Sequence, residues 1–389
     1  MLFSLALIFI SGLVLGQMFV KLKLPSLLGM IIAGVIIGPQ FLNLLSSNLL
    51  NISIDLRQIA LIIILTRAGL NLNIDDLKKV GRPAILMCFV PACFEIVGVI
   101  LLAPKILGIS ILEAGVLGTV LAAVSPAVIV PRMLKIMNEG YGKEKSVPQM
   151  IMAGGAVDDI FVIVLFAAFV SLAQGGAVDM KSFLSVPSAI MLGLVVGIIF
   201  GMILLLLFNK TNFNNSQKTL ILLAVSFVLV TIEHSNCLKI GFSGLLAVMA
   251  LGATIAKKNC NVASKLSEKF AKLWVGAEIL LFVLVGASVD VSYATKSGAS
   301  PIVLILGVLI FRMLGVFVCL IKTKLNKKER LFSAIAYLPK ATVQAAIGGL
   351  PLAMGLACGD VVLTIAVLSI LITAPLGAKL IDISYKKLL

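Results

Sequence analysis

The chain has 389 residues, of which 60% are hydrophobic and only 13% are charged, with a formal net charge of +15. A composition this apolar excludes a water-soluble globular domain, which would carry far more charged residues. The positive charge does not indicate nucleic-acid binding, because Lys and Arg cluster in short loops between apolar segments without interleaved aromatic residues. We therefore expect an all-α, multi-pass membrane protein with no nucleic-acid partner.

Thirteen candidate membrane helices follow from windows of about 20 apolar residues, the length that spans a bilayer. In chain order they cover 1–20, 25–40, 54–71, 82–104, 111–131, 147–172, 186–208, 218–233, 241–256, 273–290, 301–321, 331–355 and 361–381. The first segment lacks a basic flank and a small-residue cleavage site, so we interpret it as a retained span and not as a signal peptide.

The distribution of basic residues predicts the orientation. The loops on one side of the expected spans, together with the tail after residue 378, hold 24 of the 32 Lys and Arg residues. Because Lys and Arg are enriched in cytoplasmic loops, we expect a cytoplasmic C-terminus and an N-terminus facing outward. The membrane would be a plasma membrane, or the inner membrane if the source is bacterial.

An odd number of spans also predicts inverted repeats. If spans 1–6 and 8–13 are two repeats joined by the span at 186–208, they enter the membrane from opposite faces, as in many secondary transporters. The fifth span contains Pro126 and Pro131, and its counterpart contains Pro339 and Pro351. Since proline removes a backbone donor and clashes with the preceding turn, we expect two discontinuous helices that cross near the bilayer midplane. Their freed backbone groups then require a protein-lined site.

Two adjacent carboxylates, Asp158 and Asp159, lie near the middle of the span at 147–172. A charge at that depth costs at least ~2.5 kcal/mol, so the pair is expected to bind an ion or a proton. Neighbouring helical positions are about 100° apart, so the two side chains face different surroundings. Ser125 and the carbonyl groups of the broken helices are further oxygen ligands for Na⁺, Li⁺ or K⁺.

Three further charged residues within spans bear on this site. Glu95 and Arg312 lie at similar depth in corresponding spans of the two repeats, and we expect them to form a salt bridge that links the halves of the ion-binding bundle. Arg312 cannot carry the proton, because arginine does not deprotonate in proteins. Lys340, in the second break, is placed to offset the negative dipole ends of half-helices.

Four motifs carry a family resemblance. SPAVIVPRM, GYGKEKSVP, GGAVDD and YLPKATVQAA, in this order, closely resemble the cation/proton antiporter superfamily and, within its second subgroup, the NHA-type sodium/proton antiporters. The resemblance implies a homodimer in which a core subdomain moves as an elevator against a dimerisation subdomain. Residues 82–172 and 301–381 would form the core, residues 1–71 and 218–290 the dimerisation subdomain, and 186–208 the linker. It also implies that Asp159 is the principal ion and proton site, with Asp158 beside it.

One departure from the family pattern concerns stoichiometry. Electrogenic members carry a lysine that pairs with the first aspartate, where this chain offers Arg312, so electrogenic exchange is left open. Because Glu95 is the expected partner of Arg312, Asp158 would be freer. The expected function is exchange of Na⁺ or Li⁺ for H⁺ without enzymatic activity or a resident cofactor. Exchange of K⁺ for H⁺ is the main alternative. A sodium-coupled solute symporter is less favoured, because one Trp and four Tyr offer little to line a solute cavity. Anionic lipids are a further expected partner, at the basic run KTKLNKKER.

Overall fold

The computed structural model describes residues 1–72, 81–142, 144–175, 180–234, 243–289 and 298–389. All regular secondary structure in these ranges is helical. The chain divides into two compact units, one formed by Met1–Ile54, Asp76–Gln174 and Ile279–Leu389, the other by Asp55–Asp75 and Gly175–Glu278. The loop expected between the spans at 54–71 and 82–104 lies largely outside the described residues. The expected dimerisation and core subdomains stay a prediction.

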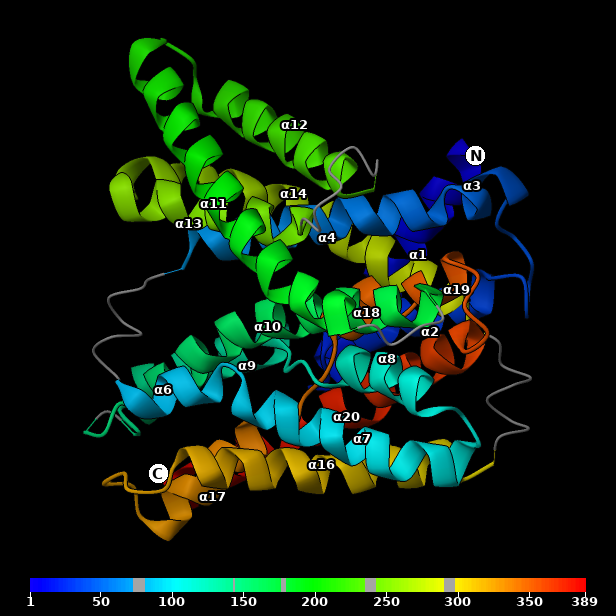
Figure 1. The fold of residues 1–389 in the computed structure, drawn as a ribbon. Helices are drawn as coiled ribbons and strands as arrows, with labels where there is room; N and C mark the ends of the chain where they lie inside the picture. Colours follow the sequence, from blue (N-terminus) through cyan, green and yellow to red (C-terminus); the bar gives the residue numbers. More distant parts are fainter. Residues whose placement is uncertain (73–80, 143, 176–179, 235–242, 290–297) are drawn as a thin grey trace. The chain divides into compact units, whose positions relative to one another are not determined.

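The first unit contains the helices that carry most of the predicted site residues. They are α1 (Leu2–Lys21), α2 (Ser26–Ile37), α3 (Ser47–Asn51), α6 (Arg82–Met87), α7 (Val90–Leu107), α8 (Ile111–Leu121), α9 (Pro126–Asn138), α10 (Val147–Gly175), α16 (Ser300–Cys319), α17 (Lys327–Ala336), α18 (Thr342–Ile347), α19 (Leu350–Ala353) and α20 (Gly359–Leu388). Figure 1 labels these helices along the chain.

The second unit is built on α11 (Met180–Lys210), α12 (Asn215–His234) and α13 (Gly244–Lys258). Both α11 and α12 pack against α13. Two further helices, α4 (Ser53–Leu70) and α14 (Cys260–Ala287), contribute residues to both units.

The structure does not reproduce thirteen uniform membrane spans. Within the described residues, nine helical segments are long and apolar enough to cross a membrane. Two of these segments combine consecutive helices, α6 with α7 and α8 with α9. The other four expected spans differ for identifiable reasons: α2 and α13 are short, α4 carries charges, and the segment at 331–355 is divided among α17, α18 and α19. The expectation of an all-helical polytopic fold is confirmed, whereas the count of thirteen and the repeat relation stay predictions.

Both predicted helix breaks are present. The first separates α8 from α9, and Pro126 begins α9 because its missing N–H is tolerated in a first turn. Ser125, before this proline, has extended backbone angles, as residues before proline prefer. The second break separates α17 from α18 and contains Pro339. Pro131 differs from the expectation, because it lies inside α9 and does not end that helix.

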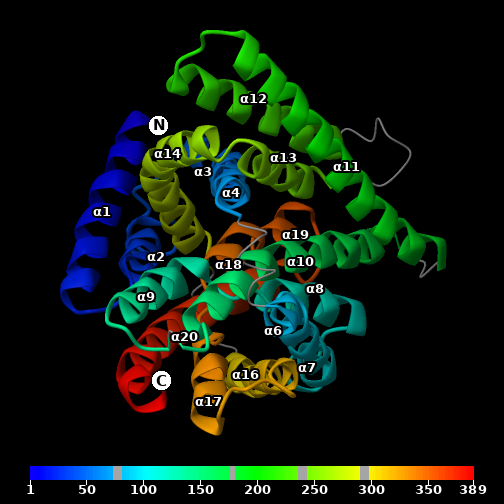
Figure 2. The same cartoon turned by 90° about the vertical axis from the view of Figure 1, so that its left-hand side faces the viewer.

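Helices α7 and α16 lie side by side in both views of the fold (Figures 1 and 2). A small residue permits this closeness: a Cβ atom on Gly315 of α16 would lie only 2.7 Å from the Cα atom of Pro91 on α7. Close backbone approach at small residues is a common way in which membrane helices pack. The pairing places Glu95 of α7 against Arg312 of α16.

Candidate functional site

The two helix breaks meet within the first unit. The backbone N–H of Ser125 donates to the carbonyl oxygen of Pro339 at 2.8 Å. The buried Gln344 side chain, on α18, reaches back to the first break, where its Nε2 donates to Ala123 O at 2.9 Å and to Leu121 O at 3.2 Å. Each break therefore satisfies polar backbone groups that the other leaves free, which is how irregular backbone is tolerated at membrane depth.

Asp158 projects from α10 into this meeting point and is fully buried. Its Oδ2 accepts from the backbone N–H of Val124 at 2.9 Å and from Arg312 Nη2 at 2.8 Å. A buried carboxylate needs such charged and polar partners to stay in place. The sequence analysis expected Asp158 to lack a charged partner, because Glu95 was assigned to Arg312. The structure differs, because the guanidinium of Arg312 has two terminal nitrogens and binds both carboxylates.

Arg312 connects the other polar groups of the site. Its Nη1 donates to Glu95 Oε2 at 2.9 Å, so the structure brings together the pair that the sequence analysis expected. Its Nε donates to Tyr337 O at 2.6 Å, and Nη1 also contacts Ala122 O. One planar guanidinium, with donors in fixed directions, thus connects Asp158, Glu95 and a carbonyl from each break.

Lys340 lies in the second break and is also fully buried. Its Nζ is 2.6 Å from Glu95 Oε1 and 2.6 Å from the carbonyl oxygen of Leu121, the last residue of α8. An ammonium at the carbonyl end of a helix opposes the helix dipole, the placement that the sequence analysis expected. The backbone N–H of Lys340 donates to Thr373 Oγ1 of α20 at 3.0 Å, which fixes the break against that helix.

Asp159 differs from its neighbour. Its side chain is half-buried, and its Oδ1 is buried without a hydrogen-bond partner in the described part of the chain. No ion pair within those residues involves it. Several buried oxygens of the same unit also have no hydrogen-bond partner there: Asp158 Oδ1, Ser125 Oγ, Thr342 Oγ1, Gln344 Oε1 and Thr364 Oγ1.

The charges of the buried network cancel without Asp159. Asp158 and Glu95 contribute two negative charges, and Arg312 and Lys340 contribute two positive charges, all on side chains with no exposed surface. Asp159 therefore adds a carboxylate that this network does not neutralise. Because an uncompensated carboxylate is unfavourable at such a position, it is suited to hold a proton or a small cation.

The sequence analysis missed three participants in this network. Gln344, Tyr337 and Thr373 connect the breaks to each other, to Arg312 and to α20. A signal for Gln344 was present, since an amide side chain in an interrupted apolar span needs partners. The contribution of Tyr337 comes from its backbone carbonyl, which residue type does not reveal.

The whole chain is similar in sequence to known membrane proteins. A family model described as "Sodium/hydrogen exchanger, transmembrane" matches residues 5–381. Human sodium/hydrogen exchanger 9B2 is 32% identical over 407 residues, covering 100% of this chain and 75% of the human protein. Human sodium/hydrogen exchanger 9B1 is 32% identical over 411 residues, covering 100% of this chain and 78% of that protein.

A solved structure has a similar fold. The sodium proton antiporter MjNhaP1 from Methanocaldococcus jannaschii, solved at pH 8, superimposes with a TM-score of 0.86. The match covers 99% of this chain and 97% of the antiporter at 21% sequence identity. At that identity the likeness concerns the fold, and it confirms the helical polytopic architecture.

Proposed function

Since this chain belongs to the family of transmembrane sodium/hydrogen exchangers, we propose that it is a secondary antiporter that exchanges Na⁺ or Li⁺ for H⁺. The resemblance to the cation/proton antiporter superfamily is thereby confirmed. Proteins with these names are transporters and not enzymes. Two relatives carry the name sodium/hydrogen exchanger across the full length of this chain, which supports the same activity here.

The observation that carries the proposal is the unneutralised carboxylate of Asp159. In our proposal, deprotonated Asp159 takes a cation on one side of the membrane, and a proton displaces that cation on the other side. One carboxylate cannot hold both ions at once, so competition couples the two fluxes. Asp158 stands beside the site, and the hydroxyl of Ser125 and carbonyls of the breaks supply further oxygen ligands.

Alternating access completes the proposed mechanism. We propose that the segments holding the site move as an elevator, within a homodimer whose inverted repeats relate the two broken helices. The C-terminus would face the cytoplasm and the N-terminus the outside, with anionic lipids at the basic cytoplasmic loops. The network of Glu95, Arg312 and Lys340 would keep the breaks together while the site moves.

The test is cation-driven proton movement in proteoliposomes that contain a pH-sensitive dye. Addition of NaCl or LiCl to vesicles with a preset pH gradient is expected to dissipate that gradient, and Asp159→Asn is expected to abolish the response. The matched control is Glu268→Gln, which neutralises an exposed carboxylate of α14. Full Na⁺-dependent proton movement by the Asp159→Asn variant would refute the assigned site.

The same assay separates the alternatives. A response to KCl in place of NaCl would identify a potassium/proton antiporter. A response that requires an added organic solute would identify a sodium-coupled symporter. Repeating the assay at different membrane voltages measures the stoichiometry, which the replacement of the family lysine by Arg312 leaves open.

A further inference from the structure

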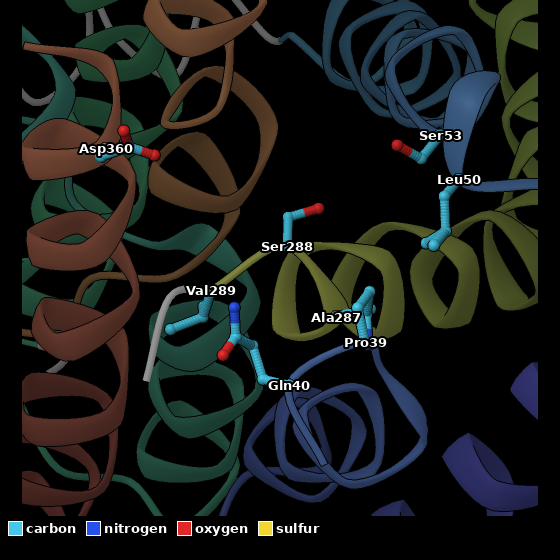
Figure 3. Close-up of a pocket in the computed structure, with 8 residues that line it drawn as sticks. All are labelled: Pro39, Gln40, Leu50, Ser53, Ala287, Ser288, Val289 and Asp360. Atoms are coloured by element: carbon cyan, nitrogen blue, oxygen red, sulfur yellow. The ribbon is translucent and has the colours of Figure 1, made fainter. Parts of the chain in front are cut away.

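A polar cavity lies in the first unit, at residues that do not belong to the buried network. It has a volume of about 320 Å³, and its described lining includes the polar residues Gln40, Ser53, Ser288 and Asp360. In Figure 3, Asp360 lies on one side and Ser53 on the other, with Ser288 and Gln40 between them. We call this cavity the Asp360 pocket. All of its described lining residues belong to the first compact unit.

The direction of three helices places the Asp360 pocket on the side opposite the basic residues. Helix α2 begins just after Lys23, α14 begins just after Lys258, and α20 ends with Lys386 and Lys387 in its last turn. The pocket is lined by the opposite ends of all three, at Gln40, Ser288 and Asp360. Since basic residues mark the cytoplasmic side, the pocket faces outward.

The chemistry of the Asp360 pocket suits a cation. Among its described lining residues, Asp360 carries the only charge, and within the described residues no ion pair involves it. Gln40, Ser53 and Ser288 add neutral oxygens, and oxygen ligands are those that alkali cations accept. The Ser288 hydroxyl donates its hydrogen to Leu284 O at 2.8 Å, which leaves its lone pairs available to a cation. A water molecule occupies roughly 30 Å³ in the liquid, so a hydrated monovalent cation fits.

Helix α20 connects this pocket to the buried network. Asp360 lies in its first turn, and Thr373 of the same helix accepts from the backbone N–H of Lys340. At 1.5 Å per residue, the two positions are roughly 20 Å apart along the helix. Thr364, one turn inward and on the same side as Asp360, is buried, and its Oγ1 has no hydrogen-bond partner in the described part of the chain.

From these observations we infer that the Asp360 pocket is an outward-facing cation subsite, which binds a hydrated monovalent cation before it reaches Asp159 or after it leaves. The inference rests on the proposed antiport. Asp360 contributes the charge, and the lining hydroxyl and amide groups contribute oxygens that replace part of the hydration shell. The subsite raises the local concentration of the transported cation at the outer end of α20.

Membrane vesicles of defined orientation test this inference. Right-side-out vesicles expose the pocket to added NaCl, and everted vesicles expose the opposite side. In right-side-out vesicles, Asp360→Asn is expected to raise the apparent KM for Na⁺ roughly threefold to fivefold, the effect of losing one partly exposed charge interaction. The maximal rate and the KM in everted vesicles are expected to stay unchanged, which also shows that the variant folds.

Two further variants sharpen the test. Asp360→Glu keeps the charge and is expected to retain a KM near that of the original chain. Glu113→Gln removes a carboxylate from the first turn of α8 outside this pocket, and glutamine can keep the capping box with Ser110. It is therefore expected to leave the KM unchanged.

Three results would overturn the inference: an unchanged outer KM in Asp360→Asn, an equal rise in both vesicle orientations, or an equal rise in Glu113→Gln. Failure of the proposed function is a separate result, because the original chain would then show no Na⁺-dependent proton movement at all.

Discussion

Arg312 Nη2 lies 2.8 Å from Asp158 Oδ2, and neither side chain has any exposed surface. This contact joins α16 to α10 at the place where the two helix breaks meet. The same guanidinium binds Glu95, which Lys340 also contacts. The electrostatic balance of the site therefore depends on a residue that cannot itself exchange protons.

Replacing this arginine is expected to destabilise the protein strongly. Arg312→Met leaves Asp158 without its charged partner and removes donors to two break carbonyls, a loss of about 3–5 kcal/mol by analogy with broken buried ion pairs. Arg312→Lys should cause an intermediate loss of stability, because a single ammonium group cannot donate to all the partners of the planar guanidinium. The measurement is the unfolding temperature of the purified protein in detergent. The control is Arg132→Met, which breaks an ion pair with Asp382, whose side chain is 44% exposed. An equal decrease in unfolding temperature in Arg312→Met and Arg132→Met would contradict the proposal that Arg312 holds the site together.

Substitutions of Asp158 and Asp159 are expected to differ in their effect on stability while both abolish transport. Asp158→Asn is expected to lower stability by about 3 kcal/mol, because it takes the negative charge away from Arg312. Asp159→Asn is expected to leave the unfolding temperature unchanged or slightly raised, because within the described residues the Asp159 carboxylate forms no salt bridge that the substitution would break. Both variants should lose exchange activity. Thermal unfolding measured beside proton movement distinguishes the roles, and a strongly destabilised Asp159→Asn protein would mean that its carboxylate has a structural partner.

Gly154 permits the close packing of α10 at the site. A Cβ atom there would overlap Tyr337 Oη and lie 2.8 Å from Met87 Cβ. Gly154→Ala is therefore expected to cost about 1–3 kcal/mol through overpacking and to slow exchange by displacing the segment whose carbonyl binds Arg312. Gly155→Ala is the matched control, since its Cβ would meet only Val124 Cγ1 at 3.2 Å. Unfolding temperatures that fall equally in the two variants would contradict this explanation.

Gln344 is expected to hold the breaks together through its amide hydrogens. Its Nε2 donates to two carbonyl groups of the first break. Gln344→Glu would place carboxylate oxygens against those carbonyls, so it should impair exchange more than Gln344→Met, which removes the donors without adding charge. Proton movement in proteoliposomes, normalised to inserted protein, provides the comparison. The opposite order of impairment would indicate that the amide oxygen, and not the donor, is the important group.

Much of the architecture could be predicted because its causes are local in the chain. Pro126 and Pro339 interrupt their helices for reasons that apply to proline anywhere, and both interruptions are present. The apolar segments predicted a polytopic helical protein, and nine of them form helices long enough to cross a membrane within the described residues. The four expected spans outside these nine are short, charged or divided, and a window average cannot separate such segments from a full span.

The sequence predicted most of the residues of the candidate site. It predicted only some of the contacts between them. Counting residues along the spans predicted that Glu95 and Arg312 lie at the same depth, and the two side chains are in contact. The sequence analysis left Asp158 freer and gave Lys340 only a dipole to offset. Neither the shared arginine nor the contact of Lys340 with Glu95 could be predicted, because both depend on how four helical segments face one another.

By itself, the sequence determined that this chain is a helical membrane protein, that two helices break at prolines, and that carboxylates lie deep within apolar segments. Apolar length, proline geometry and residue depth are properties of neighbouring residues. Only the tertiary structure decided which carboxylate is neutralised. Arg312 and its partners Glu95 and Asp158 are 217 and 154 residues apart in the chain. Packing brings them together, and packing also leaves Asp159 without an ion pair within the described residues.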